Sequence, residues 1–285
     1  MRRRACLWLA LIVLLLGMAS PVPAQEAPQR VKRDCQANLF CIEGLAFAGH
    51  AEIWLENLSD QVLTLALSLR ASSDAEAQWR RLVLERPGRH KLIEVAVPRD
   101  SDWQVAWDYT YHPGRVPAQH DDSVTYHLPY ASGEAHEVIQ SYGGGFSHQG
   151  PLRFAVDWAM PVGTPVLAAR DGVVIGFWEE SDEGGPHPVR RGKENFLWIE
   201  HADGTVAHYL HLQQDGVLVA RGERVSAGQV VALSGTTGYT TQPHLHFHVS
   251  SVALGKDALA TFPVRFQTAG GVVIKPEVGR AYPAP

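Results

Sequence analysis

Two stretches in the first half of the chain alternate between apolar and polar residues with a period of two. Residues 61–69 place four leucines at every second position, and residues 103–111 do the same with valine and aromatic side chains. A period of two predicts β-strands that bury one face, and Pro-Gly pairs at residues 87–88 and 113–114 indicate turns. We therefore expect a small antiparallel β-sandwich of immunoglobulin-like size over residues 34–130.

The second half of the chain also has strand-like patterns and no convincing long helix. Asp171-Gly172 and Ala202-Asp203-Gly204 each separate two short apolar runs, which predicts two β-hairpins. A charged, glycine-rich stretch between these hairpins is typical of a surface loop. The predicted fold class is thus mainly β, with the N-terminal sandwich followed by an antiparallel β domain over residues 131–252 and a loosely structured C-terminal tail over residues 253–285.

The first 24 residues have the order of a secretory signal peptide. Three arginines precede an apolar run of 14 residues, and small residues and prolines follow up to Ala24. The run is too short to span a bilayer comfortably, which argues against an uncleaved anchor. We expect cleavage after Ala24, a periplasmic or secreted protein without stable membrane insertion, and a flexible mature N-terminus over residues 25–33.

Charge and cysteine content restrict the partners and the compartment. The first 24 residues hold three of the 25 Lys and Arg and none of the 30 Asp and Glu, so the rest of the chain carries a formal charge of −8. A net negative chain has no electrostatic attraction for nucleic-acid phosphates, so we expect no nucleic-acid partner. Cys35 and Cys41 remain after cleavage, and an oxidising compartment predicts that they pair and pin a turn.

A cluster of histidines lies late in the second domain. If residues 243–249 form a strand, His244, His246 and His248 share one face and the intervening apolar residues share the other. Imidazole nitrogens and carboxylate oxygens are zinc ligands, and no cysteine lies in this domain. Asp157 stands among apolar and aromatic neighbours, where a buried carboxylate needs a partner such as a metal ion. His148 precedes it after a glycine-rich run.

Two further histidines, His208 and His211, follow the second hairpin turn. On a continuous strand they point to opposite faces, so only one of them can face the site. The residue pattern leaves the choice between them open.

These motifs occur in the same order as in the lysostaphin-type (LytM) zinc metallo-endopeptidases, which the chain resembles from about residue 140 to residue 249. The matching pieces are Ser147-His148-Gln149-Gly150, Ala155-Val156-Asp157, residues 161–166, residues 168–172, Tyr209-Leu210-His211-Leu212, residues 228–229, residues 234–238 and residues 243–247. The resemblance implies that His148, Asp157 and His246 bind Zn²⁺, that His211 and His244 are the catalytic pair, and that a groove lies on an antiparallel sheet.

The chain departs from the family pattern at two places. The histidine ligand usually precedes the aspartate by four residues, whereas here the separation is nine, and we interpret residues 151–155 as an insertion within a loop. The residue after the His-x-His-Phe motif is often glutamate, and here it is His248.

The resemblance implies an exported zinc endopeptidase that cuts peptide cross-links or stem peptides of bacterial peptidoglycan, with the histidine pair as base and oxyanion stabiliser. The alternative is a non-catalytic regulator that binds peptidoglycan, cell-wall amidases or other cell-wall partner proteins. A carrier domain is a third interpretation, because residues 222–230 resemble biotinyl and lipoyl carriers. The absence of lysine from residue 194 to residue 255 argues against it.

Overall fold

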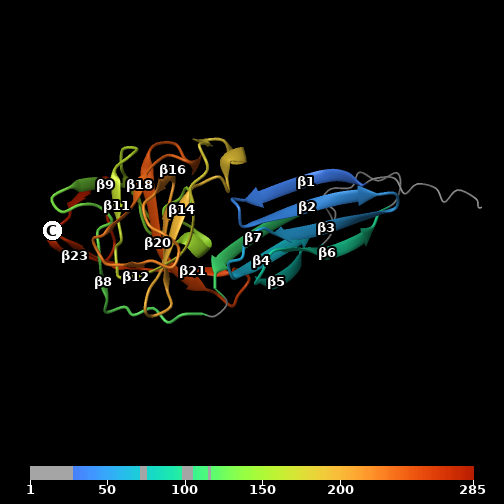
Figure 1. The fold of residues 1–285 in the computed structure, drawn as a ribbon, viewed down its shortest axis with the longest axis horizontal. Coiled ribbons are helices and arrows are strands. Elements are labelled where there is room, and N and C mark those ends of the chain that lie inside the picture. Colours follow the sequence, from blue (N-terminus) through green and yellow to red (C-terminus); the bar gives the residue numbers. More distant parts are fainter. Residues whose placement is uncertain (1–27, 71–75, 98–104, 115–116) are drawn as a thin grey trace, which may run out of the picture.

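The computed structural model describes residues 28–70, 76–97, 105–114 and 117–285. Within these residues the fold is mainly β, as predicted, and the helices are two 3-10 turns, η1 (Gly150–Leu152) and η2 (Pro188–Arg190). The strands form two lobes that lie end to end (Figure 1). The predicted signal peptide, residues 1–24, lies outside the described residues. No helix in the described ranges is long and apolar enough to cross a membrane.

The N-terminal lobe consists of two antiparallel sheets whose apolar sides share one core. The first sheet has the order β1 (Gln29–Gln36), β2 (Phe40–Phe47), β3 (His50–Asn57), β6 (Gly88–Ala96). The second has the order β5 (Gln78–Leu84), β4 (Leu63–Arg70), β7 (Ala106–Pro113). The four leucines of the first period-two stretch lie on β4 and are at most 1% exposed, so the predicted buried face is confirmed.

The described part of the segment 25–33 is more ordered than we predicted. Residues from Gln29 onward pair with β2 instead of forming a flexible segment. Cys35 and Cys41 lie opposite each other at the end of this pair and form a disulfide, as predicted. The strand was not predicted because residues 29–33 are almost all polar or basic and have no apolar period of two. In the structure, Arg30 and Arg33 both form ion pairs with Glu43 on β2.

The second lobe is built around one large sheet. Its order is β17 (Arg224–Val225), β12 (Gly172–Trp178), β14 (Phe196–Glu200), β15 (Val206–Leu210), β20 (His244–Val252), β10 (Val156–Ala159), β9 (Ala135–Gln140), β24 (Ala281–Pro283), with β21 (Leu259–Phe262) also paired to β20. Three small sheets complete the lobe: β11 (Pro165–Leu167), β18 (Val230–Ser234), β16 (Leu212–Val217); β23 (Gly271–Val273), β22 (Arg265–Thr268), β8 (Thr125–His127); and β13 (Gly184–Gly185), β19 (Gly238–Tyr239).

Two predictions for this lobe are wrong and one is confirmed. The hairpin at residues 202–204 is present, because β14 and β15 pair there. The hairpin at Asp171-Gly172 is not formed, because β11 pairs with β18 and β12 pairs with β14 and β17. The segment 253–285 is not a loose tail, because β21 and β24 pair with β20 and β9 of the large sheet.

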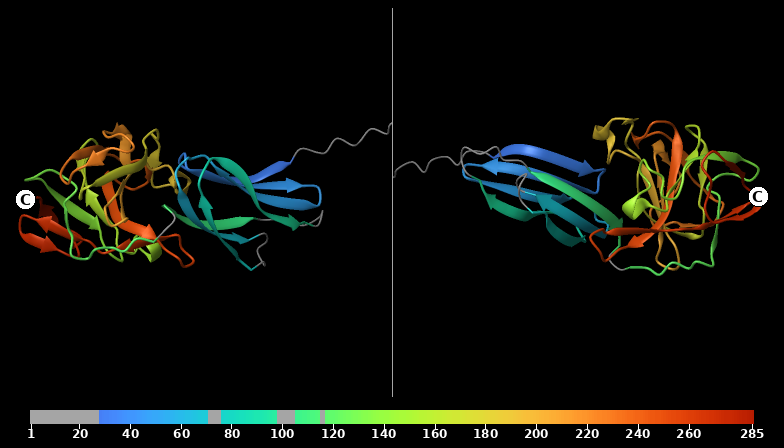
Figure 2. Two further views of the ribbon diagram at one scale, coloured as in Figure 1. Left: turned by 60° about the horizontal axis from the view of Figure 1, so that its bottom comes forward. Right: turned by 180° about the vertical axis from the view of Figure 1, so that it is seen from behind.

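The two lobes share a continuous apolar cluster. Phe196, Trp198 and Val206 of the large sheet pack with the core of the N-terminal lobe. The Tyr111 ring on β7 lies 6.3 Å from the Trp198 ring, and the backbone N–H of Ala37 donates to the carbonyl of Gly192 at 2.9 Å. Both further views show the two lobes in contact (Figure 2). The contact fixes the N-terminal lobe beside the strand that carries the histidines.

Candidate active site

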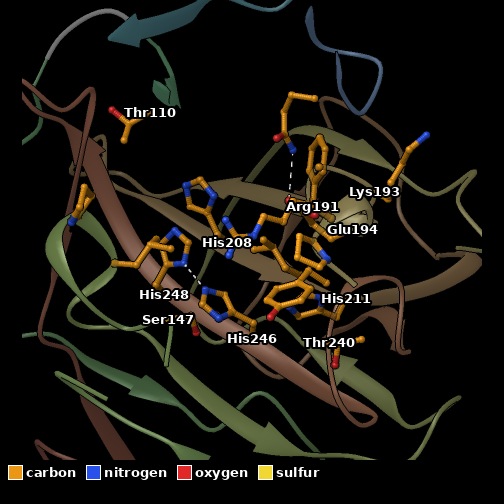
Figure 3. Close-up of a pocket in the computed structure, with 18 of the residues that line it drawn as sticks. Thr110, Ser147, Arg191, Lys193, Glu194, His208, His211, Thr240, His246 and His248 are labelled. Atoms are coloured by element: carbon orange, nitrogen blue, oxygen red, sulfur yellow. Dashed lines mark hydrogen bonds between the residues drawn. The ribbon is translucent and has the colours of Figure 1, made fainter. Parts of the chain in front are cut away.

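Strand β20 carries the histidine cluster on one face, as the period-two pattern predicts. Leu245, Phe247 and Val249 point into the core of the second lobe and are at most 1% exposed. His244, His246 and His248 point the other way, toward a cavity of 1210 Å³. The apolar half of the strand therefore anchors the three imidazoles, and Figure 3 shows His246 and His248 side by side at the cavity.

Three side chains from different elements converge beside β20. Asp157 lies on β10 directly opposite His246, because these two residues are paired in the sheet. His246 Nδ1 is 2.8 Å and His148 Nε2 is 3.1 Å from Asp157 Oδ1, and the two nitrogens are 3.3 Å apart. Two ligands about 2.0–2.1 Å from a tetrahedral zinc ion lie roughly 3.3 Å apart. The three residues are thus a group that could hold a metal ion.

The other polar side-chain atoms of His148 and Asp157 also form hydrogen bonds. His148 Nδ1–H donates to the Ser141 carbonyl at 3.1 Å, which leaves Nε2 free for a metal. Gln140 Nε2 donates to Asp157 Oδ2 at 3.2 Å. Such outer contacts fix the tautomer and orientation of metal ligands.

The protonation states also suit a metal. Burial lowers the pKa of His246 and favours its neutral form. Burial alone would raise the pKa of Asp157, but the neighbouring His246 and the close contacts with the rings of His148 and His246 outweigh it and hold the pKa well below its ordinary range. An ionised carboxylate and a neutral imidazole are the forms that bind metal ions.

His211 and His244 form a second pair next to the triad. Their ring centroids are 4.5 Å apart, and His244 Nε2 lies 4.0 Å from Asp157 Oδ1. His211 Nδ1–H donates to the Thr237 carbonyl at 2.7 Å, and His244 Nδ1–H donates to the Gln242 carbonyl at 2.9 Å. Each ring therefore keeps its Nε2 available. Burial and the nearby His244 lower the pKa of His211 to about 3, so this ring is neutral.

The prediction that only one of His208 and His211 faces the site is wrong. Strand β15 ends at Leu210, and His211 has a φ of +63°, which turns its side chain out of the strand alternation. A continued strand would have placed His211 on the core side with Tyr209. Both histidines line the cavity, His211 beside His244 and His208 stacked on His248 at 4.3 Å.

The cavity also includes a wall that sequence reasoning missed. Arg33, Trp107, Tyr109 and Tyr111 of the N-terminal lobe line it together with the histidines. The period of two in residues 103–111 marked these aromatic side chains as a strand face, but no local signal shows which lobe that face meets. Gln140 and Thr237, which form hydrogen bonds with Asp157 and His211, were also missed, because each lies on a different element from the residue that it contacts.

The separation of nine residues between His148 and Asp157 is accommodated by a folded loop. The loop contains the η1 turn and packs against β21. Thr261 Oγ1 on β21 accepts from the backbone N–H of Phe154 at 3.1 Å and donates to the carbonyl of Pro151 at 2.8 Å. The extra residues therefore do not move His148 away from the triad.

Comparison with known proteins gives matches over the second lobe. Residues 152–258 match the profile of peptidase family M23, a range that includes Asp157, His211, His244 and His246 but not His148. Peptidoglycan DD-endopeptidase ShyA of Vibrio cholerae is 41% identical over 93 residues, which are 33% of this chain and 19% of ShyA. Glycyl-glycine endopeptidase ALE-1 of Staphylococcus capitis is 39% identical over 99 residues, which are 34% of this chain and 24% of ALE-1.

A solved structure also gives a match. The catalytic domain of lysostaphin from Staphylococcus simulans has 27% identity and a TM-score of 0.32, and the match covers 45% of this chain and 87% of that domain. The matched parts of ShyA and ALE-1 amount to less than a quarter of each relative. Residues 152–258 of this chain thus form a domain of peptidase family M23, homologous to ShyA, ALE-1 and lysostaphin.

Proposed function

We propose that this protein is a zinc-dependent endopeptidase that hydrolyses peptide bonds in the cross-links or stem peptides of bacterial peptidoglycan. The observation that carries the proposal is the convergence of His148, Asp157 and His246 within 3.3 Å of one another, beside two imidazoles in one cavity. The names of the homologues support the substrate class, since ShyA is a peptidoglycan DD-endopeptidase and ALE-1 a glycyl-glycine endopeptidase.

The three converging residues would hold the ion, and their chemistry favours zinc over magnesium or calcium. Two imidazole nitrogens and one carboxylate oxygen are the donors of a catalytic zinc site with an open position, whereas magnesium and calcium prefer oxygen donors throughout. When bound, zinc supplies a Lewis acid that polarises a carbonyl group and lowers the pKa of water.

The chain itself supplies the acid–base groups. His211 is neutral, and its Nδ1–H is used by Thr237, so its Nε2 lone pair is the available base for the proton of the attacking water. His244 is held in the same way, and its Nε2 lies close to the triad, where a protonated ring would stabilise the oxyanion. The residues of the mature chain act outside the cytoplasm under this proposal, after export directed by residues 1–24.

The proposal is tested by incubating purified peptidoglycan sacculi with the zinc-loaded protein and analysing the soluble fragments by mass spectrometry. We expect new peptide termini without cleavage of glycan strands, and no release when a chelator is present. Zinc binding without any fragment release would contradict the endopeptidase and favour a non-catalytic regulator of cell-wall amidases or a peptidoglycan-binding protein.

A further inference from the structure

A row of buried polar side chains continues from the metal triad toward the N-terminal lobe. His246 Nε2 lies 3.0 Å from His248 Nδ1, and the His248 ring stacks on the His208 ring at 4.3 Å. Ser250 Oγ lies 2.8 Å from His208 Nε2 and 3.0 Å from His112 Nε2 on β7. These residues are at most 6% exposed. Figure 3 shows His246, His248 and His208 in sequence along the cavity wall.

The tautomers along this row follow from the triad. His246 points Nδ1 at Asp157 and His148, so a metal bound there requires the proton of the neutral ring on Nε2. Among the described residues, the acceptor beside that N–H is His248 Nδ1, so His248 carries its own proton on Nε2. The Nε2 atom of His248 is buried without a hydrogen-bond partner among the described residues.

Such an unpaired buried donor is unfavourable by about 1–3 kcal/mol, so hydrogen bonding at Nε2 does not account for the placement of His248. Its ring is held in place by the stack on His208, which in turn shares the Ser250 hydroxyl with His112 of the N-terminal lobe. A hydroxyl has one proton and accepts a second bond, so Ser250 can join the two imidazoles.

We infer that His248 is a positioning residue, which accepts the Nε2–H of His246 and thereby presents Nδ1 of that ring to the metal. The contacts that hold His248 in place continue through His208 and Ser250 to His112 of the N-terminal lobe. The inference rests on the proposed function, because it needs the metal at the triad. Mutation of a residue that orients a metal ligand in this way typically weakens metal binding 10–100-fold.

The test measures the zinc dissociation constant of the full chain by competition with a chromogenic chelator. His248→Phe keeps a ring for the stack on His208 but removes the acceptor, and His248→Gln restores an acceptor without the ring. We expect zinc binding about 10–100-fold weaker for His248→Phe and close to the unaltered protein for His248→Gln. His201→Phe is the matched control, because His201 is also 3% exposed but does not line the cavity.

The result that overturns the inference is equal zinc affinity in His248→Phe and the unaltered protein, or equal loss in the Phe and Gln variants, which would indicate packing alone. The absorption spectrum of the cobalt-substituted protein is a second readout, and it should change in His248→Phe only. Ser250→Ala tests the link to the N-terminal lobe and should weaken zinc binding several-fold; no change would overturn that part. Failure of the unaltered protein to bind zinc would instead contradict the proposed function.

Discussion

At the scale of single residues, backbone conformation decides which histidine lies beside His244. His211 is one of three described non-glycine residues with a positive φ. Such conformations cost of order 1–3 kcal/mol and are concentrated at functional sites. The hydrogen bond to the Thr237 carbonyl and the buried neighbours of His211 hold it there. The conformation brings Nε2 to the cavity, where an ordinary strand would have buried it in the core.

Replacement of His211 by alanine should abolish turnover and leave the metal in place. His211 does not belong to the triad, so the zinc content of His211→Ala should equal that of the unaltered protein. Removal of a general base lowers the rate roughly 10²–10⁴-fold. The measurement pairs zinc analysis with the rate of fragment release from sacculi. Full activity in this variant would refute the role of His211 as the base.

The side-chain directions along β20 could be predicted from the sequence, because a strand with one buried face has a strict period of two. Leu245 and Phe247 mark the core side, so the direction of His244 and His246 follows from them. The direction of His211 was not readable, because the period holds only within the strand and the chain leaves it at Leu210. A role for His248 could not be predicted from the sequence, because its partner His208 lies on the neighbouring strand.

At the scale of elements, the strand after β20 holds the loop that leads from His148 to Asp157. β21 lies in the segment expected to be a loose tail, yet Thr261 forms two hydrogen bonds with the loop between His148 and Asp157. Short strands of this kind lack a clear sequence period, and pairing with a distant strand leaves no local signal. The same limit explains the wrong hairpin at Asp171-Gly172, where β11 and β12 pair with other strands.

Replacement of Thr261 by valine should destabilise this loop and weaken zinc binding. Both hydrogen bonds are lost while the shape is kept, so we expect about 1–3 kcal/mol lower unfolding free energy and a higher zinc dissociation constant. Thr268→Val is the matched control, since Thr268 is also buried and forms two hydrogen bonds, in the β22–β23 turn. Equal zinc affinity in the two variants would contradict the role of Thr261.

At the scale of the whole molecule, the shared apolar cluster joins the two lobes. Phe196 and Trp198 are each 1% exposed, and they would lose their cover if the N-terminal lobe separated. The division into two β units was foreseeable from the change in pattern along the chain. Their contact, and the cavity wall that the N-terminal lobe adds, were not foreseeable, because they depend on side chains far apart in the sequence, such as Tyr111 and Trp198.

The lobes should therefore unfold together. Unfolding of one lobe would expose the apolar side chains that the other lobe buries against it, which is unfavourable. Scanning calorimetry of the chain should therefore show one main transition. Trp198→Ala, which leaves a cavity in the cluster, should lower the temperature of that whole transition. Two well-separated transitions, with only one affected by Trp198→Ala, would contradict a shared core.

Stability should fall as the solution becomes acidic. Burial lowers the pKa of His112 and of His201 to about 4 in the folded protein, against about 6.5 in the unfolded chain. Between these values the unfolded chain binds more protons, so stability present above pH 6.5 is lost toward pH 4, by roughly 3 kcal/mol for each ring. Denaturant unfolding at pH 7 and pH 4.5 checks this. Equal free energies of unfolding at the two pH values would contradict the burial of these two rings in their neutral form.

The most direct test of the account is the metal content of the purified full chain, measured by mass spectrometry beside the same measurement on Asp157→Asn. Asparagine keeps the size of the side chain but removes the negative charge that faces His148 and His246. The account predicts one zinc ion per chain in the unaltered protein and a large loss in the variant. No zinc in the unaltered protein after incubation with the ion, or equal zinc in both, would contradict a metal centre at these three residues.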